Sequence, residues 1–248
     1  MSATLLVTPA ELDSAELEIS GEAYHHLFHA ARAAVGDAVR MVDGRGRARC
    51  GEIVRVERRC AAVRLGAAAP SLEPVLWLEL LVAAPRPSRA SWLVEKGTEL
   101  GVRAFRFLDC ERSARPLDSA ALDRLGRVAR AAVEQCGRSW LPEVTGGHRL
   151  ETVLARHPHA AVFLLDPQAA AAAGELGWGA ARSLVVVGPE GGFTAGEHEL
   201  AVRLGARPIR LLASVLRVET AALAAAAWAL LQAESGASPG PLGTPIAR

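Results

Sequence analysis

The sequence predicts an α/β protein in which a parallel sheet and its helices follow a smaller, β-rich N-terminal domain. Segments of strand length that are rich in apolar residues occur at 75–83 and 102–108, and continuous apolar runs of the kind that buried parallel strands use occur at 161–165 and 184–187. Segments with helical periodicity separate several of these runs, and this β-α-β alternation is typical of a sheet covered by helices. At 248 residues the chain is long enough to bury a substantial apolar core without a metal or a disulfide.

The first part of the chain, residues 1–72, is predicted to form a separate domain. Between Val39 and Leu65, short alternating apolar and polar runs flank a Gly44-Arg45-Gly46 turn, which indicates a β hairpin. A short helix from about Gly21 to Ala34 is expected before it. The small, proline-containing stretch 67–74 places the domain boundary near residue 72.

The predicted C-terminal domain, residues 73–234, alternates strands and helices. Ser88 is a suitable N-cap for a helix from about Arg89 to Leu100. A longer helix is expected from Ser119 to Gly137, because its apolar residues recur at i, i+3 and i+4 spacing. Such a helix should pack one face against the sheet.

The end of the chain contains two further predicted helices. The tetrapeptide Thr194-Ala195-Gly196-Glu197 matches a capping box and predicts a helix that ends near Gly205. A short strand from Pro208 to Leu212 and an alanine- and leucine-rich helix from Glu219 to Gln232 should follow. Residues 235–248 are small and rich in Pro and Gly, so we expect a disordered tail.

Composition excludes several classes of protein. Hydrophobic residues make up 50% and charged residues 22% of the chain, which is an ordinary globular balance. No apolar run approaches the roughly 20 residues of a membrane helix, and the N-terminus is acidic, so we expect a cytoplasmic protein without a membrane partner. The four cysteines are too widely spaced for paired zinc ligands. We therefore expect free thiols and no metal site.

Basic residues are concentrated in one segment. All but one of the 28 basic residues are arginines, Lys96 being the exception. Residues 40–64 hold eight arginines and three acids, whereas residues 1–39 hold one arginine and six acids. This segregation suits a phosphate-binding face, and a solvated strand face explains it equally well.

The stretch from Val185 to Thr194, VVVGPEGGFT, joins a buried strand to a capped helix through glycines. In open α/β sheets, ligands bind at the carboxyl ends of strands, where glycines allow close backbone approach and helix N-termini offer free N–H groups. A cofactor loop is indicated, with a tight structural turn as the alternative. The spacing fits neither a Walker loop nor GxGxxG, and no zincin or GxSxG pattern supports a hydrolase.

A second junction between a strand and a helix follows about twenty residues later, at 211–221, LLASVLRVETA. Arg217 and Glu219 are charged residues at the mouth of this otherwise apolar segment. They are candidate functional groups, and an ion pair at the start of a helix is the alternative, because acids favour helix N-termini.

Together the two junctions resemble the C-terminal signature of the RsmE family, which methylates N3 of a uridine in 16S ribosomal RNA and belongs to the SPOUT superfamily. In that family a GPEGG(F/W)(S/T) loop is followed by an LGxRILRxETA loop. Three more blocks resemble the family in the same order, namely VEKGTELGV at 94–102, Glu111-Arg112-Ser113, and the segment 132–143. The resemblance covers roughly residues 25–234.

The resemblance implies an N-terminal PUA-like β-barrel that helps to hold RNA. It implies a C-terminal SPOUT domain, an α/β knot whose parallel sheet contains a trefoil knot. Knots are nearly absent among folds, so this feature depends on the resemblance alone. The family further implies S-adenosyl-L-methionine as cofactor, 16S rRNA of the 30S ribosomal subunit as partner, and a homodimer with its active site near the subunit interface.

The resemblance also assigns residues. The expected cofactor-binding residues are Leu165, Asp166, Gly188, Pro189, Glu190, Gly191, Gly192, Leu211, Leu212, Ser214, Val215, Leu216, Thr220 and Ala221. For catalysis, Glu219 or a neighbouring carboxylate is assigned as the base that removes the imide proton, and Arg217 as the cation that stabilises the uracil anion. The arginines expected to contact RNA are Arg32, Arg45, Arg47, Arg86, Arg112 and Arg138.

The chain departs from the family pattern at several positions. Leu212 and Ser214 stand where the family usually has Gly and Arg, and Val218 replaces a Thr. Arg86 stands where a Lys is common, and the Arg-x-Phe of the family's N-terminus is absent from residues 3–7. Two alternatives therefore stay open: a catalytically degenerate paralogue that binds RNA or assists ribosome assembly, and an active methyltransferase with a different RNA target.

Overall fold

The computed structural model describes residues 3–25, 27–28, 33–113, 116–173 and 181–236. These residues form two compact units. Among the described residues, the first unit comprises residues 3–73 and Arg130–Leu141, and the second comprises Pro74–Ala129 and residues 142–236. Each unit is described by itself.

The first unit contains a five-stranded sheet in the order β1-β3-β4-β5-β2. Strand β1 runs parallel to β3, and the other neighbours are antiparallel. The strands are β1 (Ala3–Leu6), β2 (Glu16–Ser20), β3 (Ala38–Val42), β4 (Ala48–Val56) and β5 (Cys60–Ala68), and the short helices are α1 (Pro9–Leu12) and α2 (Gly21–His25).

The predicted hairpin around Gly44-Arg45-Gly46 is confirmed, because β3 and β4 are antiparallel and both glycines have positive φ. The predicted helix from Gly21 to Ala34 was wrong in extent. The α-helix ends at His25, and Ala33 and Ala34 are not helical, while residues 26 and 29–32 lie outside the described residues.

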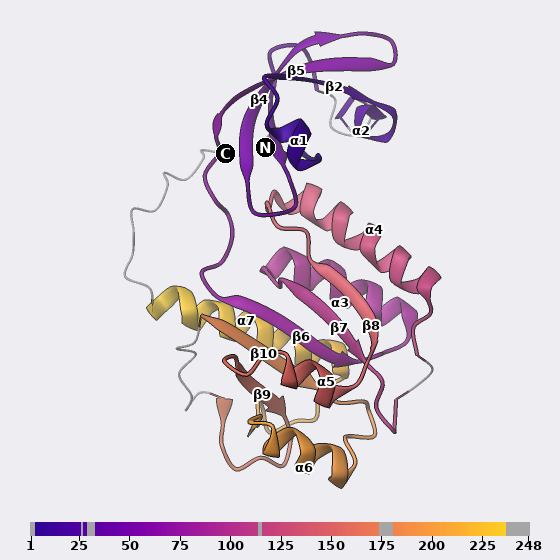
Figure 1. Cartoon of the computed structure of the whole chain (residues 1–248), viewed down its shortest axis with the longest axis vertical. Helices are drawn as coiled ribbons and strands as arrows, with labels where there is room; N and C mark the ends of the chain where they lie inside the picture. The colour runs from indigo at the N-terminus through magenta and orange to yellow at the C-terminus, as the bar shows by residue number, and fades with distance from the viewer. Residues whose placement is uncertain (1–2, 26, 29–32, 114–115, 174–180, 237–248) are drawn as a thin grey trace. The chain divides into compact units, whose positions relative to one another are not determined.

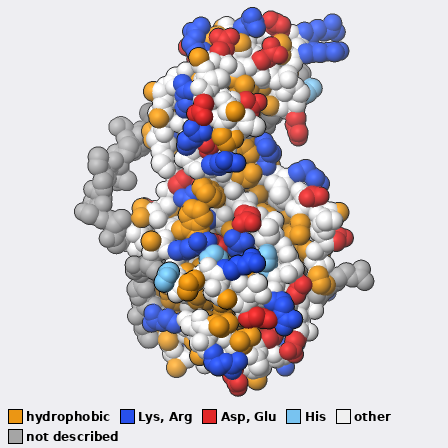
Figure 2. Space-filling view, in the orientation of Figure 1, with side chains coloured by type: hydrophobic (Ala, Val, Ile, Leu, Met, Phe, Trp, Pro, Cys, Tyr) orange, Lys and Arg blue, Asp and Glu red, His pale blue; other side chains and the backbone are white. Residues whose placement is uncertain are grey.

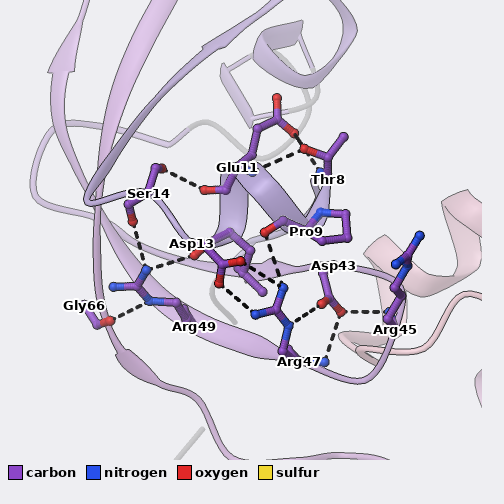
Figure 3. A network of polar contacts seen from close by, with 11 residues as sticks. Thr8, Pro9, Glu11, Asp13, Ser14, Asp43, Arg45, Arg47, Arg49 and Gly66 are labelled. Carbon is purple, nitrogen blue, oxygen red and sulfur yellow. Dashed lines mark hydrogen bonds and ion pairs between the residues drawn. The ribbon is translucent and has the colours of Figure 1, made fainter.

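The turn between β3 and β4 is held by the buried carboxylate of Asp43. This carboxylate accepts hydrogen bonds from the backbone N–H groups of Arg45 and Arg47 and from the Nε of Arg47, at 2.7–3.0 Å (Figure 3). Arg47 also pairs with Asp13 at 2.7 Å. Burial alone would raise the pKa of Asp43, but these hydrogen bonds outweigh it and lower that pKa.

Segment Arg130–Leu141 belongs to the first unit because it is bonded to Glu73. The Glu73 carboxylate accepts a hydrogen bond from Arg138 at 2.8 Å and others from the backbone N–H groups of Ser139 and Trp140 at 2.8 and 2.9 Å. The single boundary expected near residue 72 did not anticipate this segment, because the contact joins residues far apart in the sequence.

The second unit contains a six-stranded sheet in the order β11-β9-β10-β6-β7-β8, with every neighbouring pair parallel. Its strands are β6 (Trp77–Ala83), β7 (Ala104–Leu108), β8 (Glu143–His148), β9 (Ala161–Leu165), β10 (Arg182–Val187) and β11 (Arg207–Ile209). Its helices are α3 (Pro87–Leu100), α5 (Leu150–Ala155), α6 (Ala195–Arg203) and α7 (Val218–Gly236), and helix α4 (Ser119–Cys136) begins in this unit and ends in the first.

Helices cover both faces of this sheet (Figure 1). On one face, side chains of α5 and α6 share an apolar cluster with alternate residues of the strands, such as Leu164 and Val186. On the other face, α7 packs against β6, β10 and α3. The strands at the centre are therefore buried on both faces, which explains the continuous apolar run of β9 and the mostly apolar residues of β6 and β10.

Most predicted elements of this unit are confirmed, with the capping box of Thr194 and Glu197 present at the start of α6. Ser88 as an N-cap was wrong. Helix α3 begins at Pro87, which needs no backbone N–H there, and Arg86 occupies the cap without a side-chain bond. Strand β8 and helix α5 were not predicted, and strand β11 ends at Ile209 rather than residue 212.

The glycine of the TELGV motif, Gly101, has a structural role at the end of α3. It ends α3 in the left-handed conformation with φ +118°, which residues with a Cβ rarely adopt. Within the described residues no helix is both long and apolar enough to cross a bilayer. Of the predicted disordered tail, residues 237–248 lie outside the described residues.

A charged network lies near the amino ends of the central strands. Glu79 of β6 is fully buried and accepts hydrogen bonds from the Nε of Arg106 at 2.8 Å, from Arg182, and from the Trp77 indole at 3.0 Å. Burial would raise the pKa of Glu79, but hydrogen bonds from Arg182 and Arg106 outweigh it and lower the pKa. The network therefore ties β10, β6 and β7 together.

We expect Glu79→Gln to lower the free energy of unfolding by about 3 kcal/mol, because two arginines would then lack the carboxylate between them. Urea denaturation at neutral pH measures this loss. The control is Glu143→Gln, whose 58% exposed side chain also pairs with Arg106 and whose loss should cost less than about 1 kcal/mol.

The same network predicts a pH dependence. The folded-state pKa of Glu79 is lowered, so its contribution is present above the ordinary glutamate pKa and is lost as the pH falls through the folded-state pKa. The wild-type protein should therefore lose more stability on acidification than Glu79→Gln. Parallel losses in the two proteins would contradict this assignment.

Candidate active site

The candidate active site lies at the carboxyl edge of the parallel sheet, where β9, β10 and β11 end beside one another. Leu165 is in register with Val187 on one side and with Ile209 on the other. The loops that follow these strands therefore start together and line a cavity of about 630 Å³. This volume and position are those of a small-molecule site in an α/β sheet.

The cavity gathers most of the residues that the sequence analysis assigned to a cofactor. From that set, the lining contains Leu165, Asp166, Gly188, Pro189, Glu190, Gly191, Gly192, Leu211, Leu212, Ser214, Val215, Leu216 and Ala221. Thr220 is exposed on α7 and is not part of the lining. The sequence analysis missed several lining residues, among them Gln168, Val187, Phe193, His198, Ile209 and Val218.

The glycine loop after β10 needs its glycines for two different reasons. A Cβ on Gly188 would lie 2.9 Å from two ring carbons of Phe193, so the aromatic ring occupies the space of a side chain. Gly192 has φ +70°, and its N–H donates to the carbonyl of Pro189 at 2.8 Å. Thr194 then caps α6, whose N-terminus faces the cavity rim.

Asp166 and His198 form a polar pair in the cavity lining. One oxygen of Asp166 accepts from the backbone N–H of Gln168 at 2.8 Å, and the other lies 3.2 Å from the Nε2 of His198. His198 stands one turn after the cap of α6. The two residues are far apart in the chain, and no local pattern signals their contact.

A second cavity, of about 500 Å³, adjoins the first and is mainly basic. It is lined by Arg86, Arg89, Arg112, Ser113, Glu190 and Gly191, and the last two and Arg112 belong to both cavities. The Nη1 of Arg112 donates to the carbonyl of Gly191 at 2.9 Å. Arginines at this place suit an anionic ligand. Arg89 was not among the residues that the sequence analysis assigned.

Glu219 and Arg217 occupy different surroundings at the start of α7. The Glu219 side chain is 8% exposed, and its Oε1 lies 3.5 Å from the Nε of Arg89. Its Oε2 is buried and has no hydrogen-bond partner among the described residues. Arg217 is exposed and forms no ion pair with Glu219 within the described part of the chain, so the helix-start pair considered from the sequence is not observed.

The other arginines assigned to RNA lie in the first unit. Arg45 is exposed, Arg47 is bonded to Asp13 and Asp43, and Arg138 is 3% exposed and bonded to Glu73. The position of Arg138 does not favour a phosphate contact. Arg32 lies outside the described residues.

The surface of the N-terminal part carries both signs of charge. Figure 2 shows its Arg side chains interspersed with Asp and Glu on the face in view. Among the described residues, no group of three or more His, Cys, Asp or Glu side chains is arranged to hold a metal ion. The four cysteines are free thiols, and burial raises the pKa of Cys110 to about 11.

The fold and the cavity define a class of protein. The chain resembles the structure of a ribosomal RNA small subunit methyltransferase E from Neisseria gonorrhoeae, with a TM-score of 0.82 and 24% identity over 92% of this chain and 96% of that one. A probable rRNA methyltransferase from Porphyromonas gingivalis gives a TM-score of 0.79 with 28% identity over 94% and 99%. The protein thus has the same α/β fold with a parallel sheet as these methyltransferase structures.

Sequence relatives identify the family. Residues 72–230 match the RNA methyltransferase domain family. The ribosomal RNA small subunit methyltransferase E of Synechocystis sp. is 30% identical over 89% of this chain and 75% of its own length, and that of Mycobacterium tuberculosis is 32% identical over 80% of both. The chain belongs to the family of ribosomal RNA small subunit methyltransferase E.

We expect Gly188→Ala to destabilise the protein by about 1–3 kcal/mol, because the new methyl group would displace the Phe193 ring. Chemical denaturation measures the effect. Gly196→Ala is the control, since a Cβ there has nothing within 4 Å and alanine favours the helix that contains it. Equal stability of the two variants would contradict the packing of Phe193 against Gly188.

Proposed function

We propose that this protein transfers a methyl group from S-adenosyl-L-methionine to N3 of a uridine in 16S rRNA of the small ribosomal subunit. The observation that carries the proposal is the glycine loop at the cavity, in a chain whose family relatives are named as small-subunit rRNA methyltransferases. The Neisseria gonorrhoeae relative is described as bound to S-adenosyl methionine.

The residues of the first cavity fit this cofactor. Leu165, Val187 and Ile209 offer apolar walls for an adenine ring, and the glycine loop leaves backbone groups accessible. Asp166 and His198 offer polar atoms for the ribose or the amino acid portion. The bound cofactor supplies an electrophilic methyl group on a sulfonium, and the protein supplies alignment with the acceptor nitrogen.

Glu219 and Arg217, the two charged residues of the second junction, have different roles in the proposed reaction. Glu219 accepts the imide proton of uracil on its unpartnered Oε2, which leaves the ring with a negative charge shared by N3 and the flanking carbonyl oxygens. Arg217 is exposed and free to approach those oxygens. Methyl transfer would then require N3 of this anion to be held in line with the methyl group of the bound cofactor, and Glu219 and Arg217 would hold the uracil in that position.

RNA binding involves both units in this proposal. Arg86 and Arg112 in the second cavity contact phosphates next to the target uridine, and Arg45 and Arg47 contact more distant phosphates. The N-terminal residues serve as a PUA-like RNA-binding barrel, and the C-terminal residues as a knotted SPOUT domain that pairs with a second copy. A cytoplasmic location follows from a ribosomal substrate.

Calorimetric titration with S-adenosyl-L-methionine tests the cofactor site. Gly191 lines both cavities and has ordinary φ, and its Cβ position lies 3.5 Å from Arg112, so Gly191→Val should fold and fill the junction of the cavities. We expect its dissociation constant to rise about tenfold or more, with Gly196→Val as the matched control. Unchanged affinity would contradict this location.

Turnover on purified 30S subunits tests the reaction. We expect wild-type protein to form 3-methyluridine, and Glu219→Gln and Arg217→Ala each to lower kcat by about 100-fold, because each removes one stabilising group from the transition state. Mass spectrometry of nuclease digests identifies the methylated base. Methylation of another RNA would favour a different target, and cofactor binding without turnover on any RNA would favour the non-catalytic paralogue.

A further inference from the structure

Arg89 lies between the two acids of the candidate site. Its Nε is 3.5 Å from Oε1 of Glu219, and its Nη1 is 3.5 Å from Oε1 of Glu190. Arg89 stands in the first turn of α3, Glu219 in the first turn of α7, and Glu190 in the glycine loop. Helices α3 and α7 pack against each other. One guanidinium therefore connects two helix starts and the loop between the cavities.

Glu219 depends on this guanidinium more than Glu190 does. The Glu219 side chain is 8% exposed, whereas that of Glu190 is 54% exposed. Burying a carboxylate is costly unless a charge partner compensates, and Arg89 is the cation within ion-pair distance of Glu219 among the described residues. Without Arg89, this buried carboxylate would lose its charge partner.

Glu219 is not itself among the residues that line either cavity, but its partner Arg89 lines the second one. Arg89 faces Oε1, while Oε2 is buried without a partner among the described residues. A buried acceptor without a donor is uncommon in folded proteins, and its cost is recovered when a ligand supplies the donor. An imide N–H is such a donor. Arg89 therefore holds Oε1 of Glu219, and Oε2 is the oxygen that still lacks a donor.

We infer that Arg89 is a positioning residue for the proposed methyl transfer, which holds Glu219 as an oriented carboxylate and ties it to the glycine loop through Glu190. This inference rests on the proposed function. A planar guanidinium reaches two acids at once from different nitrogens, whereas a lysine ammonium is a single point charge on a flexible chain. The chain's only lysine, Lys96, lies elsewhere on α3 and pairs with Glu95 and Glu99.

The test compares two arginines of the same cavity. Arg86 and Arg89 both line the second cavity, but Arg86 is exposed and not paired with Glu219. We expect Arg89→Ala to lower kcat on 30S subunits by about 100-fold with little change in the KM for RNA. We expect Arg86→Ala to raise that KM about threefold with kcat nearly retained, because it removes a phosphate contact.

Two further variants exclude a general loss of structure. Arg89→Lys should recover part of kcat, because the ammonium can still approach Glu219, and it should remain below wild type. Arg124→Ala removes an arginine from the exposed face of α4 and should keep wild-type kcat and KM. All variants are compared by thermal unfolding.

Independently of turnover, a double-mutant cycle with Arg89→Ala and Glu219→Gln should give a non-additive change in the urea midpoint. Full kcat in Arg89→Ala, a raised RNA KM alone, or additive midpoints would overturn the inference while leaving the proposed function intact. An inactive wild-type protein with a coupled pair would overturn the proposed function and, with it, the positioning role.

Discussion

Burial of parallel strands between two helical layers is the constraint on which the site depends. Strands β6, β9 and β10 are mostly apolar on both faces, so they are stable only inside such a sandwich. Parallel strands place all their carboxyl ends at one edge, and β9, β10 and β11 are neighbours there. The order of the strands in the sheet therefore brings together the loops after Leu165, Val187 and Ile209. The cavity follows from the sheet rather than from the loops.

The two buried glutamates of this sheet domain differ in how their oxygens are satisfied. Glu79, near the amino ends of the strands, has donors from Arg106, Arg182 and Trp77 on both oxygens. Glu219, at the carboxyl edge, has an ion pair on one oxygen and nothing on the other among the described residues. A satisfied carboxylate stabilises the fold, whereas one with a free oxygen is suited to receive a proton.

The sequence predicted the parts of the fold that local patterns encode. Segments rich in apolar residues revealed β6, β9 and β10, and the spacing of Thr194 and Glu197 revealed the start of α6. Strand β8 and helix α5 were not predicted, because they are short and lack a long apolar run. The end of α2 was also predicted wrongly, since the α-helix ends at His25 and not at Ala34.

Contacts between distant residues could not be read from local patterns. The bonds of Glu73 to Arg138 and the pair of Asp166 and His198 join residues that only the folded chain brings together. Most of the residues assigned to the cofactor line one cavity, because they follow strand ends, which the apolar runs locate. Arg89 was missed since nothing in its helix distinguishes it from a solvated arginine. Its role emerges only from the position of Glu219 on another helix.

Three departures from the family pattern, Leu212, Ser214 and Val218, line the cavity. The first two are exposed and the third is buried. Leu212 is 56% exposed and Val215 81% exposed, so the loop after β11 presents apolar side chains outward at the cavity mouth. Such exposure is unfavourable unless a ligand or another chain covers it. Leu212 therefore does not fill the cavity as a side chain in place of glycine could. Val218 is buried and lines the cavity, where it keeps the shape of threonine and lacks only the hydroxyl. The glycine loop and the unpartnered oxygen of Glu219, which the proposed function uses, are retained beside these substitutions.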